Sequence, residues 1–160
     1  MKVEEVMSRE LRACAPEDDL GRAAIEMWRG DCGMLPVVWA GRVVGVVTDR
    51  DICMGLALAG CAPAERRVRE VMSGEVYSCV PEDDLGDALE LMASRRVRRL
   101  PVLEGDRLVG VLSMNDVLLN AEHRGHPPAR EILAALRAIC TPRHERPSTA
   151  PPPAVRPAAA

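Results

Sequence analysis

Residues 16–21 read Pro-Glu-Asp-Asp-Leu-Gly, and residues 81–86 read the same. The identity extends outward, because a shift of the chain by 65 positions aligns residues 6–52 with residues 71–117 without a gap. Of these 47 pairs, 21 are identical, among them Leu-Pro-Val at 35–37 and Gly-Val at 45–46. A gapless internal match of this length indicates a duplicated structural unit. We therefore expect two copies of one fold, related by an approximate two-fold axis.

Each copy is predicted to fold as β-α-β-β-α. A short extended piece (residues 12–15 or 77–80) ends at a proline, and proline followed by acidic residues favours the first turn of a helix. Two β-rich runs around a glycine-containing turn then predict a hairpin, at residues 35–47 and again at 100–112. A second helix is expected from Asp49 and from Met114. The first helix has an apolar stripe at helical spacing: Leu20, Ala23, Ala24 and Met27 in copy one, and Leu85, Ala88, Leu89 and Met92 in copy two.

The segments outside the repeat complete an α/β (α+β) fold. Residues 59–66 read as a linker, and Ile132, Leu133, Leu136 and Ile139 have the spacing of an added C-terminal helix over residues 128–140. Proline and alanine dominate after Thr141, which predicts a disordered tail. The expected division is therefore 1–61 for repeat one, 62–122 for repeat two, 123–140 for a loop and helix, and 141–160 for the tail.

Composition narrows the function classes. A length of 160 residues suits one domain or two small ones, and a net charge of −3 gives no general attraction to nucleic acid or an anionic membrane. The six cysteines form no C-x-x-C pair, the first residues have no apolar signal core, and no apolar run reaches the roughly 20 residues that span a bilayer. We expect a cytoplasmic protein with reduced thiols and neither a nucleic-acid nor a membrane partner.

The duplicated unit, with Leu-Pro-Val followed by Gly-Val-Val-Thr-Asp-Arg-Asp at 45–51 and Gly-Val-Leu-Ser-Met-Asn-Asp at 110–116, resembles the CBS-domain family. The resemblance implies that two copies pack as a Bateman module whose clefts bind AMP, ADP, ATP or S-adenosylmethionine, and that modules often pair into a disc-shaped homodimer. In the family, the Ser/Thr and the last Asp of G-x-x-[ST]-x-x-D contact phosphate or ribose. By match, the candidate residues are Gly45, Thr48 and Asp51 in copy one, and Gly110, Ser113 and Asp116 in copy two.

Physical reasoning from the residues leaves two interpretations of this motif. A hydroxyl residue that opens a helix lies beside unpaired N–H groups that suit a phosphate, and an aspartate one turn later can accept hydrogen bonds from a ribose diol. The glycine lets the strand backbone approach another group closely. The same Thr-x-x-Asp and Ser-x-x-Asp patterns are also capping boxes in form, with Asp in place of Glu.

The copies differ in their basic residues. Copy two has Arg95-Arg96-Val97-Arg98-Arg99 where copy one has Gly-Asp-Cys-Gly-Met, and Arg50 of copy one corresponds to Asn115. Arg50, Arg98 and Arg99 are candidate phosphate ligands, because a guanidinium fits phosphate oxygens. The alternative is a solvated helix end, where arginine complements the helix dipole, and this is our interpretation of Arg95 and Arg96. The two clefts are expected to differ.

Weaker candidates are interpreted structurally. His123 and His126 have no third ligand nearby, so a loop is expected in place of a metal site. Cys14 and Cys79 precede the two Pro-Glu-Asp-Asp runs and are expected to pack as small apolar groups near the clefts. Trp28 and Trp39 are expected in the core or in an interface.

The sequence therefore predicts a stand-alone regulatory module that binds an adenosine-containing ligand as a regulatory molecule and signals by conformational change. The alternative is a ligand-free scaffold that dimerises or docks on an unidentified protein partner. An enzyme is not expected, since the sequence has no Ser-His-Asp, Cys-His, P-loop or metal constellation.

Overall fold

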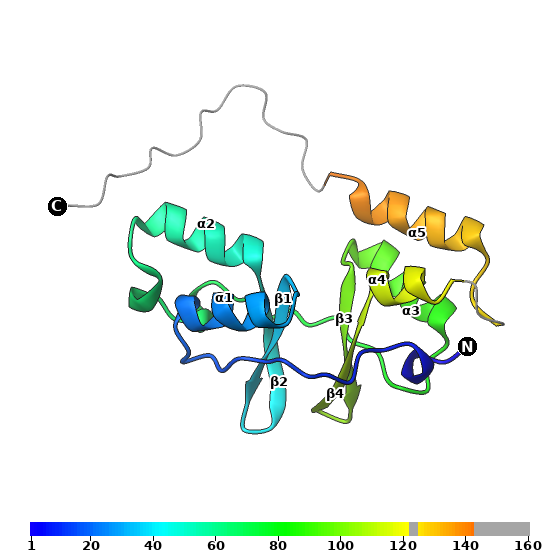
Figure 1. Cartoon of the computed structure of the whole chain (residues 1–160), viewed down its shortest axis with the longest axis horizontal. Helices are drawn as coiled ribbons and strands as arrows, with labels where there is room; N and C mark the ends of the chain where they lie inside the picture. The colour runs from blue at the N-terminus through cyan, green and yellow to red at the C-terminus, as the bar shows by residue number, and fades with distance from the viewer. Residues whose placement is uncertain (122–124, 143–160) are drawn as a thin grey trace. The chain divides into compact units, whose positions relative to one another are not determined.

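The computed structural model describes residues 1–121 and 125–142. It confirms a mixed α/β fold of two hairpins and surrounding helices, labelled in Figure 1. The strands are β1 (Met34–Trp39), β2 (Arg42–Thr48), β3 (Arg99–Glu104) and β4 (Arg107–Ser113). The helices are α1 (Leu20–Arg29), α2 (Asp49–Ala59), α3 (Leu85–Arg95), α4 (Met114–Leu119) and α5 (Ala129–Cys140), with short 3-10 helices η1 (Val3–Glu5), η2 (Pro63–Glu65) and η3 (Val68–Glu70).

Both predicted hairpins are confirmed, and they share one register. Val37 pairs with Gly45 in the first hairpin, and Val102 pairs with Gly110 in the second, each followed by a one-residue register shift. The first turn holds Ala40 and Gly41 at φ angles of 49° and 79°, a conformation that glycine adopts without steric cost. The predicted extended pieces before the helices are reduced to single parallel bridges, from Cys14 to Val37 and from Cys79 to Val102.

The first helix of each repeat begins four residues later than the proline predicted. Pro16 lies in a turn, because the side chain of Asp18 accepts a hydrogen bond from the Ala15 N–H at 2.8 Å. Asp19 then caps α1 by accepting the Arg22 N–H at 2.8 Å. The Val80 N–H donates to Asp83 at 2.9 Å in the second repeat, and α3 starts at Leu85. The expectation of a helix at the proline was therefore wrong, since local side-chain bonds close a turn first.

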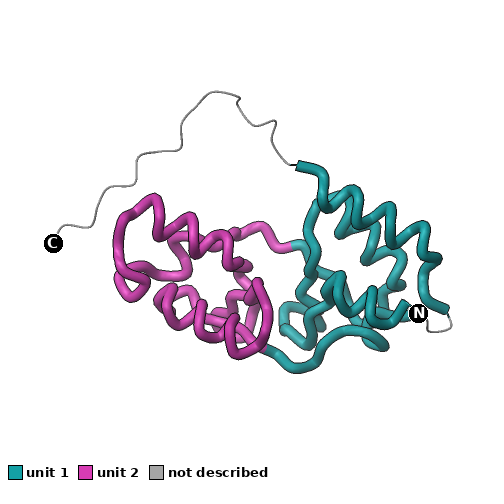
Figure 2. The backbone as a smooth tube through the Cα atoms, turned by 45° about the horizontal axis from the view of Figure 1, so that its top comes forward, with its two compact units in different colours: residues 1–11, 77–145 teal, residues 12–76, 146–160 magenta. Residues whose placement is uncertain are grey.

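The described chain forms two compact units that do not coincide with the sequence repeats (Figure 2). Unit 1 holds residues 1–11 together with the described residues from Tyr77 onward, and unit 2 holds residues 12–76. The opening segment of each repeat, residues 1–11 and 66–76, thus belongs to the unit that contains the hairpin of the other repeat. A boundary at residue 61 separates the two sequence repeats. The compact units differ from the repeats, because each unit contains the opening segment of the other repeat.

Each opening segment pairs with the edge of a hairpin. In unit 1, Ser8 exchanges two backbone hydrogen bonds with Val111, both at 3.0 Å. In unit 2, Ser73 exchanges two with Val46, at 2.9 and 3.0 Å. The 3-10 helices η1 and η3 then reach the acidic turns, where the Val3 N–H donates to the Asp83 carbonyl and the Val68 N–H to the Asp18 carbonyl. Each opening segment therefore joins its hairpin through a single antiparallel bridge.

Each unit has its own apolar core. In unit 2 the buried residues are Cys14, Leu20, Ala23, Met27, Leu35, Val37, Val47, Ile52 and Val68. In unit 1 they are Val3, Val6, Met7, Cys79, Leu85, Ala88, Leu89, Met92, Leu100, Val102, Leu112, Met114, Val117, Ile132 and Ala135. The predicted stripe of α3 is confirmed, but Ala24 of α1 is exposed, in contrast to its counterpart Leu89.

The predicted C-terminal helix is confirmed as α5, which packs on α3 in unit 1. The linker contains η2 after Gly60 closes α2 at a φ of 61°. The expected disordered tail lies outside the described residues from 143 onward, as does His123. Within the described ranges, no helix has the length and apolar character needed to cross a membrane.

Candidate functional site

The predicted motif of the first repeat lies where β2 leads into α2 in unit 2. The Thr48 hydroxyl donates to Oδ2 of Asp51 at 2.7 Å, and the Thr48 N–H donates to the same oxygen at 2.9 Å. In return, the Asp51 N–H donates to the Thr48 hydroxyl at 3.2 Å. These reciprocal bonds form a capping box, so the capping interpretation of the motif is realised in the fold.

The motif of the second repeat has the same geometry at the start of α4 in unit 1. The Ser113 hydroxyl and N–H donate to Oδ2 of Asp116 at 2.6 and 2.7 Å, and the Asp116 N–H donates back at 3.2 Å. Both aspartates are half-buried. Each cap uses Oδ2 alone, and no hydrogen bond or ion pair among the described residues involves Oδ1 of Asp51 or Asp116. Oδ1 of each aspartate therefore remains available as a hydrogen-bond acceptor at the rim of the site, by which we mean the capping box and the residues next to it.

Strand register brings the predicted arginines of unit 1 to the α4 cap. Arg99 pairs directly with Ser113 across the hairpin, and directly opposite residues of an antiparallel pair point to the same face. The Arg98 carbonyl accepts the Met114 N–H at 2.9 Å, so the backbone of Arg98 lies against the first residue of α4. The Arg98 side chain is exposed. The last two residues of the basic run, Arg98 and Arg99, thus lie next to the residues that open α4.

In unit 2 an acidic residue, Asp49, lies next to the capping box, as the first residue of α2. Met34 is buried opposite Thr48, and Gly33 lies close to Asp49, whose Oδ2 would be 2.6 Å from a Cβ at Gly33. Oδ1 of Asp49 accepts the Arg50 N–H at 2.7 Å, while the Arg50 side chain is exposed. Because a carboxylate stands where unit 1 has the buried Met114, the two rims differ in charge as well as in shape.

The two predicted glycines have a protein neighbour at close range. A Cβ on Gly45 would lie 2.7 Å from the carbonyl oxygen of Ser73, and one on Gly110 would lie 2.5 Å from Sδ of Met7 and 3.2 Å from the Ser8 carbonyl oxygen. These distances are shorter than ordinary van der Waals contact. The absence of a side chain at Gly45 and Gly110 is thus explained by the opening segments that pair with the hairpins.

A comparison with family models matches the CBS domain twice, at residues 3–57 and 68–122. The chain belongs to the CBS-domain family. The CBS domain-containing protein YhcV of Bacillus subtilis is 35% identical over 118 residues, which cover 74% of this chain and 84% of that protein. The inosine-5′-monophosphate dehydrogenase of Methanocaldococcus jannaschii is 32% identical over 131 residues, 80% of this chain but 24% of the enzyme.

Solved structures agree on the fold of the CBS pair. The CBS domain pair of protein MJ0100, described in complex with 5′-methylthioadenosine and S-adenosyl-L-methionine, superposes with a TM-score of 0.69. It is 20% identical and covers 77% of this chain and 98% of that chain. At this identity the likeness shows the architecture, which is that of two CBS repeats with a hairpin and helices each.

The sequence analysis did not identify Asp49 as a residue that affects the site. The alignment of the two repeats could have done so, because it places Asp49 opposite the uncharged Met114 and thus indicates a difference in charge beside the two caps. The pairing of Ser8 and Ser73 with the hairpins was also missed, because nothing local in the sequence specifies it.

The remaining candidates have structural environments. Cys14 and Cys79 are buried as predicted, and burial, with a smaller contribution from a nearby aspartate, raises the pKa of each thiol to about 12. Of the two positions expected for the tryptophans, the core is excluded, since Trp28 is 86% exposed and Trp39 57% exposed, and an interface stays a prediction. Within residues 1–121 and 125–142, no group of three or more His, Cys, Asp or Glu side chains is placed to hold a metal ion.

Proposed function

We propose that this CBS pair is a regulatory module that binds an adenosine-containing ligand, AMP, ADP, ATP or S-adenosylmethionine, at the two caps and signals by a change of conformation. CBS pairs are regulatory modules as a family, and the structurally similar MJ0100 pair is described with two adenosine-containing ligands. The observation that carries the proposal is the cap chemistry. Asp51 and Asp116 each hold their helix through Oδ2 and keep Oδ1 for a further hydrogen bond.

The proposed roles follow from the polar groups at each rim. Oδ1 of Asp51 or Asp116 accepts a hydrogen bond from a ribose hydroxyl. Thr48 and Ser113 position the aspartate through their hydroxyl groups, and the positive end of the helix dipole at each cap favours a phosphate oxygen. Arg50, Arg98 and Arg99 supply positive charge to the phosphates. Gly45 and Gly110 act indirectly, by letting the opening segment support the strand that ends in the motif.

The two sites are proposed to differ in occupancy. Unit 1 has Arg98 and Arg99 beside its cap, whereas the cap of unit 2 has Asp49 beside Gly33 and the exposed Arg50 next to it. A carboxylate near a phosphate costs free energy through like-charge repulsion. We therefore expect the cap of α4 to take the more highly charged ligand.

The second candidate is a ligand-free scaffold that dimerises or docks on a protein partner. It is favoured by the completeness of the two capping boxes, which satisfy the helix ends without a bound molecule. Homodimer formation, an unidentified protein partner, a cytoplasmic location and the absence of enzymatic activity stay proposals alongside the main one.

Titration calorimetry of wild type, Asp51→Asn and Asp116→Asn with each candidate ligand tests the proposal. Loss of a charge-assisted hydrogen bond weakens binding by about 1.5–3 kcal/mol, or roughly 10- to 150-fold. Asparagine caps a helix about as well as aspartate, so the melting temperature should change little. Asp19→Asn, which alters the cap of α1, is the matched control and should leave affinity unchanged. If neither variant weakens binding threefold, or if no ligand binds wild type, the aspartates are caps only and the scaffold is favoured.

A further inference from the structure

The rims of the two units share the capping box but differ at four neighbouring positions. The differing residues are Gly33, Met34, Asp49 and Arg50 in unit 2, and their counterparts Arg98, Arg99, Met114 and Asn115 in unit 1. The four residues of unit 1 include two arginines and no acid, whereas those of unit 2 combine one acid with one base. By charge, the rim of unit 1 suits an anion and the rim of unit 2 suits a group that carries both signs.

Asp49, the first residue of α2, presents a carboxylate oxygen that the protein does not use. Its Oδ1 accepts the Arg50 N–H at 2.7 Å, and no hydrogen bond or ion pair within the described parts of the chain involves its Oδ2. The carboxylate lies against Gly33, where a Cβ would come within 2.6 Å of Oδ2. Because Asp49 is exposed and Gly33 has no side chain, Oδ2 can accept a hydrogen bond from a cationic group of a ligand.

Arg50 supplies the opposite charge at the same helix start. Its side chain is exposed, and in residues 1–121 and 125–142 no hydrogen bond or ion pair involves its guanidinium. Consecutive residues of a helix do not face each other, which explains why Asp49 and Arg50 form no ion pair. Both charges therefore remain for a bound molecule.

An α-amino acid group matches this pair of charges. Its ammonium donates hydrogen bonds to a carboxylate such as that of Asp49, and its carboxylate accepts them from a guanidinium such as that of Arg50. Asp51 keeps its own Oδ1 for a ribose hydroxyl, since its Oδ2 holds the cap. The rim of unit 2 thus has separate acceptors for a ribose and for an ammonium group.

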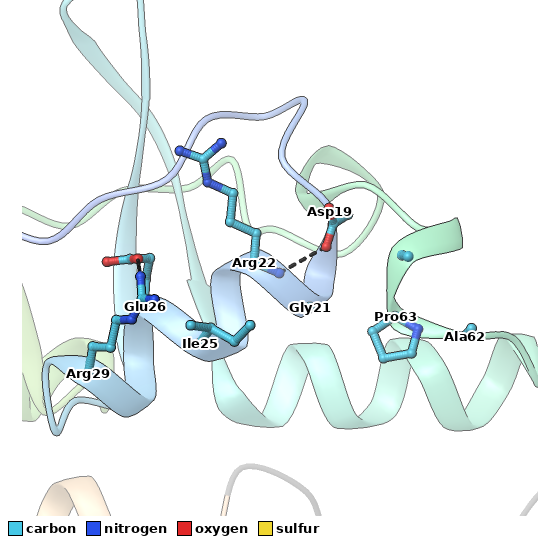
Figure 3. Close-up of a pocket in the computed structure, with 9 residues that line it drawn as sticks. Asp19, Gly21, Arg22, Ile25, Glu26, Arg29, Ala62 and Pro63 are labelled. Carbon is cyan, nitrogen blue, oxygen red and sulfur yellow. Dashed lines mark hydrogen bonds and ion pairs between the residues drawn. The ribbon is translucent and has the colours of Figure 1, made fainter.

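A groove between α1 and η2 is another place in unit 2 where acids and bases lie together (Figure 3). Its charges are paired with one another. Oδ1 of Asp19 accepts the Arg22 N–H at 2.8 Å, and the Arg22 guanidinium lies 3.2 Å from Asp18. Glu26 contacts Arg29 at 2.9 Å. A zwitterion in this groove would have to displace these ion pairs, so the α2 cap is the better match.

We propose that the site at the α2 cap of unit 2 takes an adenosine ligand whose 5′ substituent carries an amino acid group, with Asp49 on the ammonium and Arg50 on the carboxylate. The site at the α4 cap of unit 1 keeps the phosphorylated ligands, so one module responds to two kinds of adenosine compound. The inference rests on the proposed function and narrows the ligand class of one of its two sites. In that site Arg50 meets a carboxylate in place of a phosphate.

S-adenosylhomocysteine and 5′-methylthioadenosine are the probes, because both are 5′-thioethers of adenosine and only the first carries the amino acid group. Calorimetry uses Asp116→Asn as the parent variant, since this change weakens the site of unit 1. The parent should bind S-adenosylhomocysteine about 10-fold more tightly than 5′-methylthioadenosine. Asp49→Asn and Arg50→Asn should each reduce this ratio by about 3- to 5-fold, the upper range for an exposed charge pair, with the affinity for 5′-methylthioadenosine unchanged.

Asp31→Asn and Arg29→Asn in the same parent are the matched controls, because they remove the same charges from unit 2 outside its rim. Asp31 is exposed, and asparagine tolerates its φ of 45°. Arg29 belongs to the groove between α1 and η2. Both controls should leave the ratio unchanged, and an effect as large as that of the rim variants would overturn the assignment to Asp49 and Arg50. Circular dichroism and thermal unfolding verify that each variant is folded.

The outcomes separate this inference from the proposed function. If the parent binds both thioethers equally, or if the rim variants change the ratio by less than 2-fold, the inference is refuted while nucleotide binding stands. If an Asp51→Asn parent, in which the site of unit 2 is weakened, shows the same ratio, the preference belongs to unit 1 and the assignment to unit 2 is wrong. If wild type binds no adenosine compound at all, the proposed function fails and the inference fails with it.

Discussion

Replacement of Gly45 by alanine tests the pairing between an opening segment and a hairpin. A methyl group at this position would lie 2.7 Å from the backbone carbonyl oxygen of Ser73, about 0.7 Å inside ordinary contact. That oxygen also accepts the Val46 N–H at 3.0 Å. Because the obstacle is backbone, a change of side-chain rotamer cannot relieve the contact, and the opening segment must move away from β2.

The expected cost follows from overpacking and from the bonds that the movement weakens. Overpacking costs about 1–3 kcal/mol, and each weakened backbone hydrogen bond adds roughly 0.5–1.5 kcal/mol. We expect Gly45→Ala to lower the free energy of unfolding by about 2–3 kcal/mol, which for a chain of this size lowers the melting temperature by about 5–10 °C. Gly110→Ala should cost about 1 kcal/mol, because its nearest obstacle is the flexible thioether of Met7.

Urea and thermal unfolding of the purified variants measure these differences, and hydrogen exchange at the Val46 and Ser73 amides locates them. Gly86→Ala is the control, since a Cβ there meets nothing within 4 Å on α3 and should be neutral or stabilising by up to about 1 kcal/mol. The reasoning is refuted if Gly45→Ala is as stable as Gly86→Ala, or if Gly110→Ala is the more damaging of the two substitutions.

Two further predictions concern the cores. Ile132→Ala should lower the free energy of unfolding by about 2–4 kcal/mol, because Ile132 lies on the face of α5 that is buried in the core of unit 1. Leu133→Ala on the exposed side of the same helix should change it by less than about 0.5 kcal/mol, and equal effects in urea unfolding would contradict the packing of α5 on α3. At pH 8, iodoacetamide should label the exposed Cys53 and Cys140 and spare Cys14 and Cys79, whose pKa values are raised to about 12. Since these thiols keep their protons in the folded state and lose them near 9 when unfolded, they contribute stability that is present below about pH 9 and declines toward pH 12, and a Cys14→Ala, Cys79→Ala double variant should lack that part of the decline.

Much of the fold could be predicted because its signals are local. The glycine-containing turns between β-rich runs specified both hairpins, and the periodic apolar residues specified α3 and α5. The Thr48 and Asp51 cap is also local, since its atoms come from residues three positions apart. The helix start at Leu20 was missed because proline and aspartate serve both in turns and at helix ends, and the side-chain bond of Asp18 decides between them.

The position of Arg99 beside Ser113 required the register of the hairpin, which the sequence restricts but does not specify by itself. The exposure of Trp28 required knowledge of what packs on each helix. A large apolar residue beside a buried stripe is equally consistent with a position in the core, under an added helix or in an interface. Only the tertiary structure showed that α5 packs on α3 in unit 1, whereas Trp28 on α1 is exposed.

By itself, the sequence determined that one structural unit occurs twice, which elements each copy contains, and where hydroxyl and carboxyl groups meet at a helix start. Tertiary structure alone decided which opening segment pairs with which hairpin. Met-Ser occurs at 7–8 and at 72–73, and the receiving Gly-Val occurs at 45–46 and at 110–111. Either hairpin therefore offers each segment a nearly identical edge to pair with, and the local sequence does not distinguish the two edges. The choice depends on how the chain connects the segments in space, and it joins Ser8 to Val111 and Ser73 to Val46.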